Sequence, residues 1–321
     1  MSFRNEADYI SKYRRVLEHF DATKVGLTAT PVLHTTQIFG DSVFTYSYHE
    51  EVSVTATSAP ADHLSIQAFA PDWFRWAVSR PKQSRRIVVE GCSIHYLLWP
   101  AEAETSIGRG LLFVHGGGAH AYWWSFIAPY FTRHFRVAAI DLSGMGDSGR
   151  RHDYRSEMRA AEMRAVIADA GLGERPFVIG HSFGGLMTMK FASQFGHELG
   201  GAVIVDSPIR SPQDEAHQPM TPPNWGNKKV YPTFDAALER LRLMPPQTCD
   251  NDFIVEFIGR HSVMAVDGGW TWKFDGAALG VRRFGEPFRE YLQAVRCRAA
   301  RPCRRSACRR SYQRSSSDRA R

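Results

Sequence analysis

One serine in the sequence stands in a setting typical of a catalytic nucleophile. Ser182 lies in the run Gly180-His181-Ser182-Phe183-Gly184, with an apolar stretch directly before it and a helical pattern directly after it. Where a strand meets a helix in so tight a turn, the residues flanking the serine must be small, which accounts for Gly180 and Gly184. The hydroxyl then stands at the end of the sheet, where the helix start stabilises a developing negative charge. We predict that Ser182 is a nucleophile and that the two glycines form its elbow.

A second glycine-rich run supplies candidate donors for an oxyanion. His115-Gly116-Gly117-Gly118 follows an earlier apolar run. Glycines let the backbone approach a substrate carbonyl and direct an N–H group at it. We predict that the backbone N–H groups of Gly117 and Phe183 form an oxyanion hole. His115 is expected to brace this loop rather than to act as a base.

The other partners of a catalytic serine are less directly indicated. A serine hydroxyl is a weak nucleophile without a base within hydrogen-bonding reach. Asp206 ends the apolar run 202–205 and is a candidate acid, with capping of the turn before Ser207 as the alternative. His261 is a candidate substitute base, with a packing or surface role as the alternative.

The run from Gly144 to Gly149 matches the letters of a dinucleotide-binding fingerprint, G-x-G-x-x-G. Asp141 and Asp147 would place negative charge where a pyrophosphate must sit, and a lone match of this kind is weak. The cysteine spacings fit no zinc pattern well. No organic cofactor and no metal ion are therefore expected.

Short apolar runs alternate with helical patterns through the middle of the chain, and the polar motifs follow the ends of the runs. This alternation predicts a mostly parallel sheet with helices on both faces. Chemistry collects at the carboxyl ends of strands in such sheets. A hairpin of two strands, at 87–89 and 94–99, is expected first. The other expected strands are 110–114, 135–140, 176–179 and 202–205, and the main expected helices are 156–170 and 186–194.

In this order and spacing, the motifs resemble the α/β-hydrolase superfamily over about residues 71–296. The resemblance implies an α/β fold with a lid after the sixth strand. It also implies a serine hydrolase that forms an acyl-enzyme on Ser182 from a small-molecule substrate, expected to be an ester. The family order is nucleophile, acid, histidine, with the histidine after the eighth strand, whereas the last histidine here is His261.

The last two strands and the catalytic histidine of the family are therefore expected to be missing, and the activity to be impaired. A catalytically inactive hydrolase fragment or a binding protein is the alternative. Loss of the last strands would leave the strand at 202–205 at a sheet edge, so self-association through that edge is expected.

The first fifty residues resemble a different family. The runs 8–20, 26–31, 39–40 and 44–48 are similar to the motor subunit of type I restriction enzymes around its Thr-Ala-Thr motif. The chain contains no Gly-Lys-Ser/Thr phosphate loop. We interpret residues 1–50 as a helicase-like remnant of a gene fusion, and a DNA-dependent motor fragment is the third hypothesis for function.

Composition separates the body of the chain from its tail. The formal net charge is +7, but ten arginines and one acid lie between Arg296 and Arg321, together with three of the five cysteines. The basicity therefore belongs to the tail, and no nucleic-acid partner is expected for the body. We interpret the tail as out-of-frame translation without a fold. The expected division is 1–50 remnant, 51–70 linker, 71–206 hydrolase core, 207–269 lid, 270–296 return to the core, and 297–321 disordered tail.

No signal-peptide pattern opens the sequence, and no apolar run approaches the roughly 18 residues needed to cross a membrane. A cytoplasmic protein without membrane contact is expected.

Overall fold

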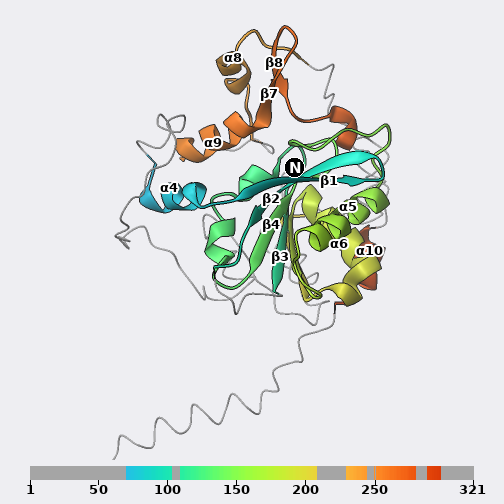
Figure 1. Ribbon diagram of the computed structural model, residues 1–321. Coiled ribbons are helices and arrows are strands. Elements are labelled where there is room, and N and C mark those ends of the chain that lie inside the picture. The colour runs from blue at the N-terminus through green and yellow to red at the C-terminus, as the bar shows by residue number, and fades with distance from the viewer. Residues whose placement is uncertain are drawn as a thin grey trace, which may run out of the picture.

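The computed structural model describes residues 70–102, 109–207, 229–243, 249, 251–279 and 288–297. Within them the chain forms a six-stranded sheet with helices packed on it, and a smaller unit projects from one end of the sheet (Figure 1). The predicted restriction-enzyme-like segment, almost all of the predicted linker, and all but one residue of the predicted tail lie outside the described residues.

The sheet begins with the predicted hairpin, formed by β1 (Gln83–Val89) and β2 (Cys92–Trp99). The two residues between the strands are Glu90, with φ 47°, and Gly91, with φ 74°. Two positive φ angles in a two-residue loop match the twist of antiparallel strands, which favours this hairpin. Sequence reasoning placed the turn at Gly91 and so located the hairpin correctly.

The four other strands of the sheet agree with the predicted runs to within two residues at each end. The sheet order is β1-β2-β4-β3-β5-β6, with three parallel and two antiparallel pairings. The sheet is therefore mixed but mostly parallel. These strands are β3 (Gly110–Val114), β4 (Arg136–Ile140), β5 (Phe177–His181) and β6 (Gly201–Val205).

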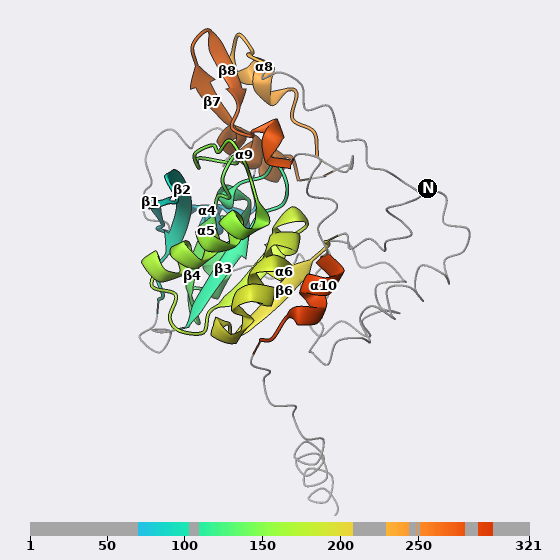
Figure 2. The ribbon, with the colours of Figure 1, turned by 90° about the vertical axis from the view of Figure 1, so that its right-hand side faces the viewer.

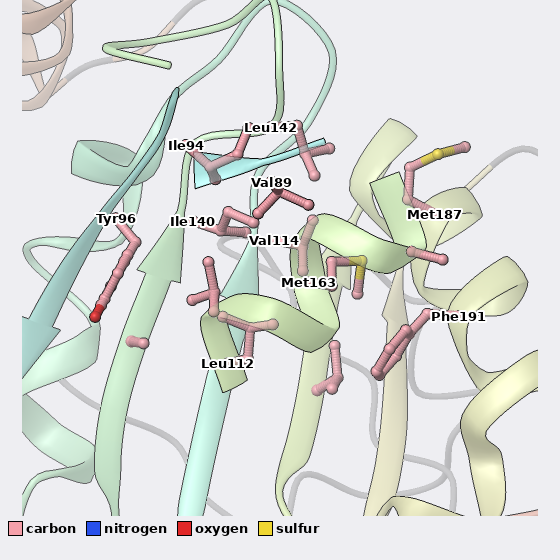
Figure 3. Packing of buried hydrophobic residues seen from close by; sticks show 14 of the residues in the cluster. Val89, Ile94, Tyr96, Leu112, Val114, Ile140, Leu142, Met163, Met187 and Phe191 are labelled. Atoms are coloured by element: carbon pink, nitrogen blue, oxygen red, sulfur yellow. The ribbon is translucent and has the colours of Figure 1, made fainter. Parts of the chain in front are cut away.

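The two faces of the sheet are covered differently. One face carries α5 (Ser156–Asp169) and α6 (Phe183–Phe195), with α10 (Phe288–Ala294) packed on α6 (Figure 2). The opposite face carries the short 3-10 helices η3 (Ala121–Trp124) and η4 (Ala128–Phe131). Side chains from the strands and from α5 and α6 form the main core, in which Leu112, Ile140 and Met163 are fully buried (Figure 3).

Strand β6 lies at the edge of the described sheet. All five of its residues are half-buried, whereas all five residues of β3 are buried. Among the described residues β6 pairs only with β5, so the main sheet has no further strand beside β6 in this part of the chain. One edge of β6 is therefore without a described partner.

The smaller unit follows β6 in the chain, where the lid was predicted. It contains α8 (Phe234–Leu238), α9 (Asp252–Ser262) and a hairpin of β7 (Val263–Val266) and β8 (Gly269–Trp272). Helix α9 also packs near α4 (Asp72–Ser79) through an aromatic cluster. We call α8, α9, β7 and β8 the cap.

The cap extends slightly further along the chain than predicted. Residues 270–272 were expected to return to the core, but they belong to β8 and pair with β7. The turn between the two strands is Asp267-Gly268, with Gly268 at φ 83°. Asp-Gly between apolar residues is a hairpin signal that the sequence analysis did not use. No helix in the described ranges is long and apolar enough to cross a membrane.

Candidate active site

Ser182 lies between β5 and α6, at the first position of the turn into the helix. Its backbone has φ 51° and ψ −116°, a region that residues other than glycine rarely occupy. The Ser182 N–H donates to the Val205 carbonyl at 2.8 Å, and the Ser207 hydroxyl donates to the Ser182 carbonyl at 2.8 Å. The end of β6 therefore holds this strained conformation from the side, and Ser182 is half-buried.

The glycines around Ser182 are required by packing. A Cβ on Gly184 would lie 2.4 Å from the His115 carbonyl oxygen, and a Cβ on Gly180 would lie 2.4 Å from the Gly184 carbonyl oxygen. Both contacts are with backbone atoms, which cannot rotate away. The predicted elbow glycines thus allow helix α6 to start directly against the ends of β3 and β5.

The glycine loop after β3 lies beside this turn. A Cβ placed on Gly116 would be 3.5 Å from Ser182 Cβ, and one on Gly117 would be 3.5 Å from Phe183 Cβ. Gly117 is exposed, whereas Gly116 is buried. The two backbone segments chosen as oxyanion donors from the sequence, at Gly117 and Phe183, are therefore neighbours.

His115 is fully buried behind the loop and has both ring nitrogens in use. Its Nδ1 lies 2.7 Å from the Gly116 carbonyl oxygen, and its Nε2 accepts the Leu142 N–H at 3.1 Å. Because Nε2 is an acceptor, Nδ1 must carry the proton. Burial lowers the pKa of His115 below its ordinary value, although the nearby Asp141 carboxylate opposes this. A neutral ring with two fixed hydrogen bonds braces the loop.

Arg159 contacts Phe183 and the loops beside the site, a role that the sequence did not indicate. Its guanidinium carbon lies 4.7 Å from the centroid of the Phe183 ring, and its Nη2 donates to the carbonyls of Ser143 and Ala278. The last contact holds η6 (Gly276–Leu279), whose Leu279 side chain faces Gly117. The buried side of α5 also carries Ser156 and Glu162, so an arginine there gives no sequence signal for a buried position.

Asp206 stands at the end of β6, exposed, with φ 45°. Burial lowers the pKa of His181, and the negative charge of Asp206 opposes this effect. A strained backbone at the end of a strand is a feature of functional sites. Asp206 directly follows Val205, whose carbonyl accepts the Ser182 N–H, so Asp206 lies near the elbow.

His261 lies at the end of α9, in the cap. Its ring stacks on Tyr122 with centroids 3.7 Å apart and planes at 6°, and it also contacts Phe257. The neighbouring Ser262 hydroxyl bonds His120 Nε2 at 2.9 Å, which joins the cap to the loop after β3. These contacts give His261 a packing position. The described hydrogen bonds of His95, His115 and His120 go to groups other than the Ser182 hydroxyl.

One group of residues has the spacing of a metal site: His95, Asp141 and Asp147. Its donors are already engaged. Asp141 accepts hydrogen bonds from the Ala121 and Asp147 N–H groups and lies 2.7 Å from His95 Nδ1, while Asp147 pairs with Lys273 at 2.7 Å. A metal ion would have to displace these partners, so the residues do not fit a metal site.

Comparison with known proteins agrees with the architecture. Residues 111–252 match the family model described as alpha/beta hydrolase fold. E-2-(acetamidomethylene)succinate hydrolase has a similar structure, with a TM-score of 0.57 at 17% identity over 68% of this chain and 78% of that one. The body of this chain therefore has the α/β-hydrolase fold.

Curated relatives include named hydrolases. An esterase of Mycobacterium tuberculosis is 25% identical over 206 residues, which cover 62% of this chain and 64% of that protein. A 2-hydroxy-6-oxo-2,4-heptadienoate hydrolase of Pseudomonas putida is 32% identical over 147 residues, 42% of this chain and 52% of that protein. The chain thus spans between half and two thirds of the length of these relatives.

A separate short match concerns another protein. A stretch of 52 residues, 16% of this chain, is 58% identical to the type I restriction enzyme EcoKI endonuclease subunit of Escherichia coli and covers 4% of it. The resemblance to type I restriction enzymes inferred from the sequence is confirmed.

Proposed function

We propose that the chain is a serine hydrolase that cleaves carboxylic esters through an acyl-enzyme on Ser182. The observation that carries the proposal is the strained backbone of Ser182 at the start of α6, with φ 51°. Strain of this kind persists where the surrounding structure holds it and is characteristic of the nucleophile in this fold. The esterase among the relatives supports an ester as the first substrate to test.

In the proposed reaction, the Ser182 hydroxyl attacks the ester carbonyl and loses its proton to a base. The N–H groups of Gly117 and Phe183 donate to the oxyanion, and the amino end of α6 adds a favourable dipole. Collapse of the tetrahedral intermediate expels the alcohol, and water then hydrolyses the acyl-enzyme and releases the carboxylic acid product. Asp206, exposed near the elbow, is the proposed acid of the site.

Weak turnover is part of the proposal, and what supports it is that His95, His115 and His120 direct their described hydrogen bonds to groups other than the Ser182 hydroxyl. Without the base, an acyl-transfer site keeps only the contributions of binding and the oxyanion hole, which amount to roughly 10³–10⁴ over water. The same observation favours a second candidate, a catalytically inactive hydrolase that retains binding. His261 is the substitute base to test.

The test uses p-nitrophenyl acetate, butyrate and octanoate with the full chain. Turnover above the buffer rate that disappears in Ser182→Ala supports the hydrolase. Ser193→Ala is the matched control, because Ser193 lies in the same helix and its hydroxyl donates only to the Lys190 carbonyl. If Ser182→Ala retains the full rate, the proposed nucleophile is wrong. Loss of the rate in His261→Ala, with the fold intact, assigns the base to the cap.

A further inference from the structure

A second serine is joined to a histidine and an aspartate, away from Ser182. The Ser84 hydroxyl lies 2.9 Å from His95 Nε2, and His95 Nδ1 lies 2.7 Å from Asp141 Oδ2. Ser84 is on β1, His95 is on β2, and Asp141 directly follows β4. The three residues therefore form a continuous hydrogen-bonded chain across one edge of the sheet, in the sequence of groups that activates serine nucleophiles.

The hydrogen bonds of Asp141 determine the direction of this chain. Burial alone would raise the pKa of Asp141, but the side-chain hydrogen bond with His95 is the largest of the effects that lower it to about 2. As a carboxylate, Asp141 accepts from the Ala121 N–H at 2.5 Å and the Asp147 N–H at 2.8 Å. His95 Nδ1 must then be the third donor. In the neutral ring, Nε2 is left as an acceptor, directed at the Ser84 hydroxyl.

The three residues differ in burial in the way that a reactive serine requires, with a buried base and carboxylate and an exposed hydroxyl. His95 is 1% exposed and Asp141 is fully buried, while Ser84 is exposed on the outer strand of the sheet. The base and its orienting carboxylate are thus held rigidly and screened from water, and the hydroxyl is open to a reagent. An exposed serine without such a partner has the reactivity of an ordinary alcohol.

The position of Ser84 in the sheet, and the charge beside it, distinguish it from the site at Ser182. Strands β2, β4 and β3 lie between β1 and β5, so the two serines are on different parts of the sheet. Arg86 shares a face of β1 with Ser84, because side chains two residues apart point the same way. Its guanidinium donates to the Asp147 carbonyl and places positive charge on that face.

We propose that Ser84 is a second reactive nucleophile, which takes an acyl or phosphonyl group from activated esters or phosphonyl fluorides. The Ser84 oxygen bonds to the carbonyl carbon or to phosphorus, and its proton passes to His95 Nε2. The bond to the leaving group then breaks. An alcohol departs with the proton from His95, whereas fluoride departs as the anion and His95 releases its proton to water. Asp141 stabilises the transient imidazolium, and Arg86 favours reagents that develop negative charge.

A fluorophosphonate probe tests the proposal on the full chain in the Ser182→Ala background. The chymotryptic peptide from Ala77 to Tyr96 contains both Ser84 and Ser79, so their adducts are resolved by fragment ions in one spectrum. Ser79 is the internal control, because its hydroxyl donates only to the Trp76 carbonyl. General-base assistance is worth roughly a hundredfold or more, so Ser84 is expected to label at least that much faster than Ser79.

Two variants complete the test. Ser84→Ala should remove the adduct from this peptide, and His95→Gln should slow Ser84 labelling to the rate of Ser79, with circular dichroism to verify the fold. Because Ser84 and Ser79 are compared within the unaltered hairpin, the main result does not depend on the folding of the histidine variant. Equal labelling of the two serines overturns the proposal. The adduct on Ser182 in the wild-type chain is followed on a different peptide, so failure at one serine is distinct from failure at the other.

Discussion

The backbone strain at Ser182 gives a prediction in which stability and function move in opposite directions. Glycine adopts positive φ angles freely, whereas alanine retains the strain of the serine. Strain at such a φ and ψ is worth about 1–3 kcal/mol, and the extra entropy of glycine in the unfolded chain costs about 0.5–1 kcal/mol. Ser182→Gly is therefore expected to be more stable than Ser182→Ala by up to about 2.5 kcal/mol, while neither variant hydrolyses the ester.

A control at Ser193 should show the opposite order of stability for its glycine and alanine variants. Ser193 lies in the regular part of α6, where glycine is less favourable than alanine by about 1 kcal/mol. Ser193→Gly should therefore be less stable than Ser193→Ala. The free energy of unfolding is measured in urea by the fluorescence of the eight tryptophans, with the slope on denaturant compared among variants. If Ser182→Gly is the less stable of its pair, as at Ser193, the turn carries no strain and the argument for a functional elbow fails.

Three further predictions concern the packing, the pH dependence and the edge of the fold. Gly184→Ala should lower the free energy of unfolding in urea by about 2 kcal/mol or more, because its Cβ would meet two backbone carbonyls. Gly259→Ala is the control: its Cβ meets the movable ends of Leu238 and Leu241, so it should lower the free energy of unfolding clearly less. Equal losses of stability in the two variants would contradict the packing argument. Burial lowers the pKa of His120 from 6.5 to about 4, so the neutral ring stabilises the fold above pH 6.5, and this contribution is lost as the pH falls toward 4. His120→Gln should flatten the dependence of the unfolding free energy in that window, and an unchanged slope would show that another group titrates there. The edge of β6 that has no partner strand among the described residues should promote self-association, which sedimentation measures as a concentration-dependent mass. Val203→Lys should reduce this self-association, and a monomer at all concentrations would show that the edge is covered.

Local residue patterns were enough to predict the strands and the elbow. Apolar runs ending in glycine-rich or polar motifs located β3 to β6 within two residues, because strands buried on both faces need continuous apolar side chains. The glycines around Ser182 also indicate the elbow directly from the sequence, because only glycine fits where a helix starts against two strands. The hairpin of the cap was missed, although Asp267-Gly268 is its sequence signal.

What the sequence by itself determined was the class of fold and the residue that stands at its elbow. Both follow from rules that act over a few neighbouring residues, namely strand periodicity and the space available at a tight turn. Only the tertiary structure decided how distant residues combine. It placed the Phe183 ring against Arg159, stacked His261 on Tyr122, and joined Ser84, His95 and Asp141 in one hydrogen-bonded chain. Ser84 and Asp141 are 57 positions apart, and sheet pairing alone brings them together, because β2 lies between the strands that carry them.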